Sequence, residues 1–170
     1  MPDEIINRVA NSKLVTINLE DYYPEGKRVL FDIKDWLYEG FVLREKDFRD
    51  RVKTYDWAQY KDCYVALMCS SDAIIPAWAF ILLSIHLEPF TKKTVIGNLE
   101  LLETSIYQDI LNVLDVSEFK NKPLIIKGCS NKPVPQNAYI MLVNKLQPVA
   151  KSIMYGEACS AVPLYKHKQS

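Results

Sequence analysis

Three of the four cysteines in this sequence are followed directly by serine, and each Cys-Ser pair comes shortly after a run that is typical of a β-strand. These cysteines are Cys69, Cys129 and Cys159. The carboxyl ends of the strands in an open α/β sheet form the usual ligand crevice. We therefore expect the three thiols to meet at one edge of a sheet, although they are 60 and 30 residues apart along the chain.

A group of thiolates is a site for a soft metal ion, and zinc takes four ligands, among them histidine and carboxylate side chains. The sequence has no CxxC or HxxxH pair, so the fold would have to assemble the whole site. We predict zinc or iron as the ion, and six residues as candidate ligands: Cys69, Cys129, Cys159, Glu157, His86 and Asp72. The alternatives stay open: free cysteines are often small buried hydrophobes, and His86 is placed to bond the last carbonyls of a helix.

Other chemistries have weaker signals. A cysteine–histidine enzyme would need His86 to reach one of the thiols, and no nucleophile signature is present. The five glycines show neither of the spacings that cradle phosphate groups. The sequence therefore favours a protein that is not an enzyme.

The composition argues against some classes of binding partner. Twenty-one basic and 21 acidic residues balance in the 170-residue chain, which gives no global argument for nucleic acid or an anionic membrane. The basic tail Lys166-His167-Lys168 is interpreted as a solvated terminus. The longest apolar stretch, 73–83, is shorter than the roughly 20 residues of a membrane span, and residues 1–4 lack signal-peptide features. We expect a cytoplasmic protein with reduced thiols.

Hydrophobic periodicity predicts the elements that must position these residues. Strands are expected at 14–19, 29–33, 63–68, 94–97, 124–127, 152–155 and 162–165, and helices at 41–55, 71–88, 99–114 and 136–146. Their order predicts a single α/β domain over 1–170, with one mixed, mostly parallel sheet and flanking helices. The aromatic-rich part, 1–60, belongs to the same domain and supplies core or a protein interface.

The helix after Cys69 has two expected features. Ser70-Ser71-Asp72 supplies residues that cap helices, so the helix is expected to begin near Ser71 or later. The following residues are apolar on nearly all sides, which predicts a buried helix.

Four strings resemble a known family. They are Glu-Gly-Lys-Arg-Val-Leu-Phe-Asp-Ile-Lys-Asp-Trp-Leu (25–37), Asp-Ala-Ile-Ile-Pro-Ala-Trp-Ala (72–79), Lys-Gly-Cys-Ser-Asn-Lys-Pro-Val-Pro (127–135) and Tyr-Gly-Glu-Ala-Cys-Ser-Ala-Val-Pro-Leu-Tyr-Lys (155–166). They are similar to the uncharacterised bacterial family DUF2480 over essentially the whole chain. The resemblance implies a link to iron–sulfur cluster assembly but no established activity. The three Cys-Ser motifs fit its pattern, whereas Cys63 is incidental.

Two hypotheses follow. The first is an accessory factor for iron–sulfur cluster assembly or metal and sulfur handling, with assembly proteins as partners. The alternative is a non-enzymatic protein–protein interaction module whose cysteines are structural. Both leave a homodimer open, and neither involves nucleic acid or a membrane.

Overall fold

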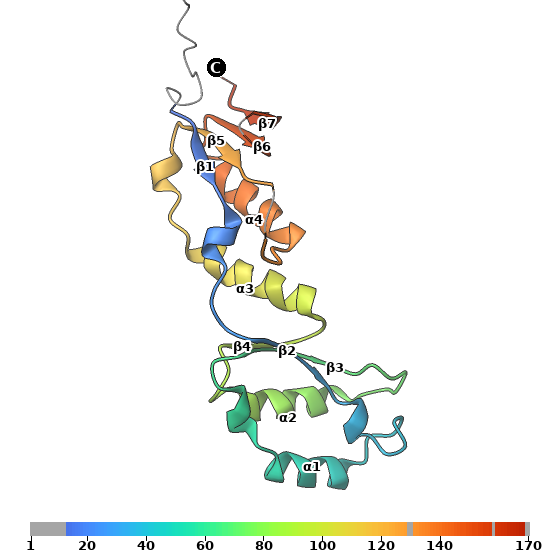
Figure 1. Cartoon of the computed structure of the whole chain (residues 1–170). Coiled ribbons are helices and arrows are strands. Elements are labelled where there is room, and N and C mark those ends of the chain that lie inside the picture. Colours follow the sequence, from blue (N-terminus) through green and yellow to red (C-terminus); the bar gives the residue numbers. More distant parts are fainter. Residues whose placement is uncertain (1–12, 129–130, 158, 169–170) are drawn as a thin grey trace, which may run out of the picture. The chain divides into compact units, whose positions relative to one another are not determined.

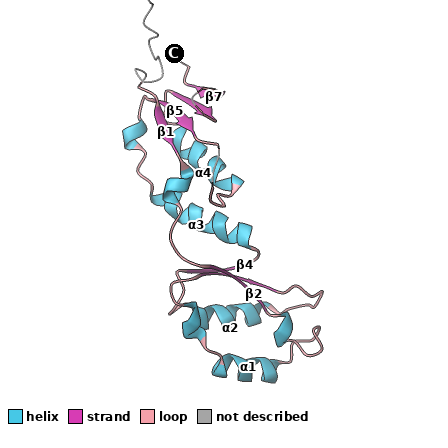
Figure 2. Cartoon of the chain, in the orientation of Figure 1, coloured by secondary structure: helices cyan, strands magenta, loops and turns pink. Residues whose placement is uncertain are grey.

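The computed structural model describes residues 13–128, 131–157 and 159–168, and it confirms an α/β fold with mostly parallel strands (Figures 1 and 2). The strands are divided between two sheets, with the orders β1-β5-β6-β7 and β2-β3-β4. All neighbouring strands are parallel except β6 and β7. The prediction of a single sheet is therefore wrong. Hydrophobic periodicity identifies strands, but it does not show which of them pair.

The chain forms two compact units. The first unit consists of Met1–Tyr23 together with Tyr107–Ser170, and the second unit is Pro24–Ile106. One boundary falls inside helix α3, Leu99–Val113, so no proline- or glycine-rich linker marks it in the sequence.

The second unit alternates strands and helices. In chain order its elements are β2 (Arg28–Asp32), α1 (Glu45–Thr54), β3 (Tyr64–Met68), α2 (Ala77–Leu87) and β4 (Lys93–Ile96). Both crossovers step in the same direction across the sheet, so the right-handed rule puts α1 and α2 on one face. The central strand β3 is buried at four of its five positions, which explains its continuous apolar sequence.

The core of the second unit lies between its sheet and these two helices. Its buried residues are Phe31, Ile33, Phe48, Val52, Trp57, Cys63, Val65, Leu67, Ala79, Leu83 and Leu87. The opposite sheet face includes Ala66, which is fully buried, and Arg28, which bonds to Glu103 in α3.

The first unit is built on β1 (Val15–Ile17), β5 (Pro123–Ile126), α4 (Gln136–Leu146), β6 (Ser152–Tyr155) and β7 (Val162–Lys166), with the end of α3. Its core joins the sheet to α3 and α4. The buried residues are Ile17, Leu19, Tyr107, Leu111, Phe119, Leu124, Ile126, Ala138, Leu142, Leu146, Ala150 and Ile153. The buried Tyr107 hydroxyl donates a hydrogen bond of 2.8 Å to the carbonyl of Leu19.

Helix α2 departs from its prediction in two ways. It begins at Ala77, with Pro76 in the N-cap position, so capping by Ser70-Ser71-Asp72 is wrong. The residue before a proline is disfavoured in the helical region, and the helix therefore starts only after Pro76. Burial is also incomplete, because Ile81 and Ile85 are exposed.

Within the part of the chain that the structure describes, no helix is long and apolar enough to cross a membrane.

Candidate functional site

The carboxyl edge of the three-stranded sheet holds a fixed polar loop. Asp32, at the end of β2, accepts hydrogen bonds of 3.0 Å from the backbone N–H groups of Lys34 and Ser70. Burial raises the pKa of the Asp32 carboxyl, but the bonds from Ser70 and Lys34 and the charge of Lys34 outweigh it, so the pKa lies below its usual value. The carboxylate therefore ties the loop after β3 to the end of β2.

Two cysteines belong to this unit and pack with its core. Cys63 is buried in the core, and Cys69 is half-buried against it. The Cys69 Sγ lies 3.6 Å from Ser71 Oγ, which accepts a 3.2 Å hydrogen bond from the N–H of Ala73. The loop thus satisfies its own polar groups, as a structural cysteine requires.

His86 and Asp72 lie in the second unit. The half-buried imidazole of His86 stacks on the Trp57 ring, with the centroids 5.6 Å apart. Asp72 is exposed in the loop before α2. Neither makes a hydrogen bond or ion pair with a cysteine or another candidate ligand within the described residues.

The turn after β6, at the carboxyl edge of the four-stranded sheet, carries a second Cys-Ser motif. Cys159 is exposed in the turn between β6 and β7, where Ser160 N–H donates to the carbonyl of the exposed Glu157 at 2.9 Å. The predicted ligand Cys129 lies outside the described residues. Tyr155, at the end of β6, donates a 3.4 Å hydrogen bond from its hydroxyl to the carbonyl of Gly128, just after β5.

The three thiols therefore do not follow strands of one sheet. Cys69 follows β3 of the three-stranded sheet, whereas Cys159 follows β6 of the four-stranded sheet. Cys129 follows β5, the neighbour of β6. Among residues 13–128, 131–157 and 159–168, no three His, Cys, Asp or Glu side chains are grouped to hold a metal ion.

Most aromatic residues of the first third pack in the core, whereas Tyr38 and Phe41 are exposed. Trp36, Tyr55, Trp57 and Tyr60 surround Phe31, with ring centroids 5.4 to 6.0 Å from it. Burial, followed by a 2.8 Å hydrogen bond to Tyr55, raises the pKa of the Tyr60 hydroxyl well above its usual value. Through Phe48, these rings hold β2 against α1, which is a structural role.

Exposed apolar side chains remain on this unit. Ala77, Ile81 and Ile85 recur every fourth residue along α2, and the two isoleucines are 54% and 62% exposed. The chain just before α2 adds Ile74, which is 95% exposed. We call Ile74, Ala77, Ile81 and Ile85 the α2 stripe.

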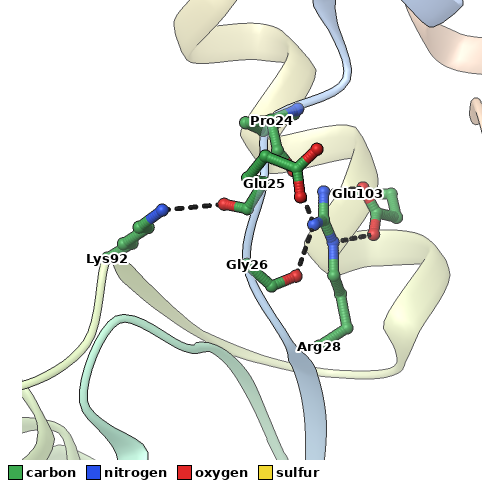
Figure 3. A network of polar contacts seen from close by, with 6 residues as sticks. All are labelled: Pro24, Glu25, Gly26, Arg28, Lys92 and Glu103. Carbon is green, nitrogen blue, oxygen red and sulfur yellow. Dashed lines mark hydrogen bonds and ion pairs between the residues drawn. The ribbon is translucent and has the colours of Figure 1, made fainter.

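A buried ion pair fixes the start of the same unit (Figure 3). Arg28 Nε lies 2.6 Å from Glu103 Oε1, and Arg28 Nη2 lies 3.3 Å from Oε2. The remaining Arg28 donor, Nη1, reaches the carbonyls of Pro24 and Gly26 at 2.7 Å. Lys92 donates to the Glu25 carbonyl between them, also at 2.7 Å. These bonds join β2, the segment before it, α3 and the residue before β4, so the network is a structural clamp.

With these arrangements established, comparison with known families places the chain. The family model described as "Protein of unknown function (DUF2480)" matches residues 3–167. The chain belongs to the DUF2480 family. No curated protein and no solved structure matches it. DUF2480 membership confirms the resemblance found in the four sequence strings, and it brings no activity or ligand with it.

Sequence reasoning missed Glu103 and the α2 stripe. Glu103 sits four residues after Leu99 and three before Ile106, on the apolar side of a predicted amphipathic helix. A carboxylate in that place signals a buried cationic partner. The stripe had no signal of its own, because a helix that is apolar all round does not reveal which side the sheet will cover.

Proposed function

We propose that this DUF2480 protein is a cytoplasmic, non-enzymatic interaction module that docks a protein partner through the α2 stripe. The observation that carries the proposal is the exposure of Ile81 and Ile85 on a helix whose buried side is already filled by Ala79, Leu83 and Leu87. Apolar residues repeated along one helix line are the contacts by which helices seat in partner surfaces.

The binding free energy expected from the two isoleucines can be calculated from their exposed fractions. Full burial of an isoleucine side chain is worth about 1.5–3 kcal/mol. With roughly half of each side chain still exposed, Ile81 and Ile85 would contribute about 1 kcal/mol each on docking. Together, about 2 kcal/mol corresponds to a roughly 30-fold change in Kd.

The cysteines of the second unit support a structural role in this module. Cys63 and Cys69 both pack with its core, and the polar contacts of Cys69 stay within its own loop. Replacing Cys69 with serine should therefore leave partner binding unchanged.

To test the proposal, a photo-crosslinking amino acid is placed at Ile81 or Ile85 of the protein inside the cells that produce it. Lys46 on α1 is the exposed control position. We expect a defined adduct from positions 81 and 85 that is absent from position 46. The partner, once identified and purified, should bind the Ile81→Ser Ile85→Ser variant about 30-fold more weakly. An adduct with a second copy of the chain would identify the partner as the chain itself. Unchanged affinity in the double variant would refute the proposal.

A second candidate function rests on the neighbouring strands β5 and β6. We propose that Cys129 and Cys159, with Glu157, handle iron, zinc or sulfur as an accessory to iron–sulfur cluster assembly. The support is topological: β5 and β6 are parallel neighbours with Ile126 level with Tyr155, and the two motifs follow these strand ends. Cysteine thiolates are the usual ligands of iron–sulfur clusters and of structural zinc.

Metal analysis of anaerobically purified protein tests this candidate. Stoichiometric zinc or iron that is lost in the Cys129→Ser Cys159→Ser variant, and kept in the matched Cys63→Ser Cys69→Ser variant, is the expected result. Equal metal content in the two variants, or none in the parent protein, would contradict it. Assembly proteins would then have no reason to be partners.

A further inference from the structure

The amino edge of the four-stranded sheet carries a lysine at each strand. Lys13 comes two residues before Val15, the first residue of β1, and Lys122 and Lys151 directly precede β5 and β6. The antiparallel strand β7 ends at this edge with Lys166. All four side chains are exposed.

Backbone pairing sets these positions level with one another. Val15 pairs with Leu124, so Lys13 and Lys122 stand at the same height, and Pro123 pairs with Ser152, so Lys151 stands beside Lys122. The Lys151 N–H donates to the Lys122 carbonyl at 3.0 Å, and the His167 N–H donates to the Lys151 carbonyl at 2.8 Å. Neighbouring strands lie about 4.8 Å apart, so the backbones that carry these lysines follow one another at roughly that spacing.

The row is part of a strong local charge imbalance in a chain of zero net charge. Residues 119–170 contain eight lysines and a single acidic residue, Glu157. Glu157 follows β6, which puts it at the opposite edge of the sheet. Within the described residues, none of the four lysines of the row forms an ion pair with a carboxylate.

The stability of the sheet does not explain the lysine row. Like charges directly opposite each other on neighbouring strands destabilise a sheet. Lysines that protect a sheet from aggregation lie along its outer strands, whereas Lys122 and Lys151 precede the two inner strands. An arrangement that costs stability and places cations side by side is accounted for by an anion that binds between them.

A cleft lies at this end of the sheet. Its volume is about 1090 Å³, and its lining consists of Asn121, Lys151, Ser152, Lys166, His167 and Lys168. The lining offers ammonium, amide and hydroxyl donors, and it includes no carboxylate. Asn121 is held in place by a left-handed backbone with φ of 57° and by its N–H bond to the Val149 carbonyl at 2.8 Å.

We propose that this cleft binds a small anion with two or more phosphate groups. Phosphate oxygens accept charge-assisted hydrogen bonds from ammonium groups, and adjacent phosphates can engage Lys151 and Lys166, the two lysines of the row that line the cleft. The lining has no Phe, Tyr or Trp ring on which bases could stack, as a single-stranded nucleic-acid site would provide. A concave site also fits a compact ligand better than a flat membrane surface.

The test is calorimetric titration of the full chain with inorganic triphosphate at about 0.1 M salt, where the Debye length is about 10 Å. The Lys151→Gln Lys166→Gln variant should bind at least about tenfold more weakly. The matched control, Lys127→Gln Lys132→Gln, removes the same charge from the carboxyl edge and should stay within about twofold. Absence of saturable binding, or an equal loss in both variants, would overturn the proposal.

Titrations with other phosphate compounds distinguish between the possible ligands. Equal affinity for inorganic triphosphate and a nucleoside triphosphate supports recognition of the phosphates alone, and tighter nucleotide binding supports a nucleotide. Tighter binding to single-stranded RNA, or to vesicles with anionic lipids, would refute a small anion. Should the double variant fail to fold, Lys168→Gln, which alters only the segment after β7, replaces it. Amide NMR shifts of the parent protein must then concentrate at residues 151–152 and 166–168.

Discussion

Replacing Glu103 with glutamine should destabilise the second unit far more than its single lost charge suggests. The side chains of Arg28 and Glu103 are only 12% and 6% exposed, so the variant removes the charge of Glu103 from beside a buried guanidinium. Breaking a buried pair from one side typically costs 3–5 kcal/mol. Because Arg28 keeps its bonds to Pro24 and Gly26, and glutamine can still accept one hydrogen bond, we expect about 3 kcal/mol.

Urea unfolding followed by tryptophan fluorescence is the appropriate assay. All three tryptophans of the chain, Trp36, Trp57 and Trp78, belong to the second unit, so the signal reports the part of the protein that contains the pair. Their rings pack in or against its core, where unfolding changes their environment.

The chain provides a matched control for this experiment. Glu45→Gln in α1 removes the same charge from an ion pair with Arg49, whose side chain is 48% exposed, while that of Glu45 is 64% exposed. An exposed pair of this kind is worth about 0.5 kcal/mol or less. Free energies of unfolding for the two variants that agree within about 0.5 kcal/mol would show that the Arg28–Glu103 clamp is not a buried pair in solution.

Three further predictions concern individual contacts. Gly26→Ala should lower the free energy of unfolding, measured in urea, by about 2 kcal/mol or more, because the φ of Gly26 is 140° and an added Cβ would lie 2.8 Å from the Tyr64 ring. Gly40→Ala should lower it by only about 1 kcal/mol, because Gly40 has a φ of 75° but open space around it. Equal losses in the two variants would contradict this prediction. Burial raises the pKa of Asp32, but the hydrogen bonds from Ser70 and Lys34 hold it below its usual value in the folded protein. The stability that this carboxylate contributes is therefore complete above the unfolded pKa and is lost as pH falls through the folded pKa. The free energy of unfolding of the Asp32→Asn variant should therefore fall less on acidification than that of the parent protein. An equal fall in the two proteins would refute this prediction. Tyr107→Phe removes the buried hydrogen bond to the Leu19 carbonyl and should cost about 1 kcal/mol. Faster amide hydrogen exchange in β5 would show this loss, and unaltered exchange would count against the bond.

Sequence periodicity located the elements well but not their pairing. The predicted helix at 136–146 is α4 without a change in its bounds, and the strand predicted at 152–155 is β6. Both patterns are local, so neighbouring residues suffice to predict them. Whether the strand before Cys69 pairs with the strand before Cys129 depends on contacts between distant residues, and the sequence pattern is silent on that point.

The candidate sites show the same division. The Cys-Ser motifs were visible because residue type and position along the chain were enough to find them. The lysine row was missed because Lys13, Lys122, Lys151 and Lys166 are scattered in sequence and become neighbours only through the register of four strands. The basic tail at 166–168 was its one local sign, and in isolation it is typical of a solvated terminus.

The two proposed sites of the first unit can be tested independently because they lie at opposite edges of one sheet. Strands β5 and β6 have four residues each, and a strand advances about 3.3 Å per residue, so the edges are roughly 13 Å apart. This exceeds the Debye length of about 10 Å at 0.1 M salt, so exposed charges at one edge are largely screened from the other. A change in metal content caused by lysine replacement, or in phosphate affinity caused by cysteine replacement, would therefore have to act through the fold, and amide hydrogen exchange across β5 and β6 would reveal it.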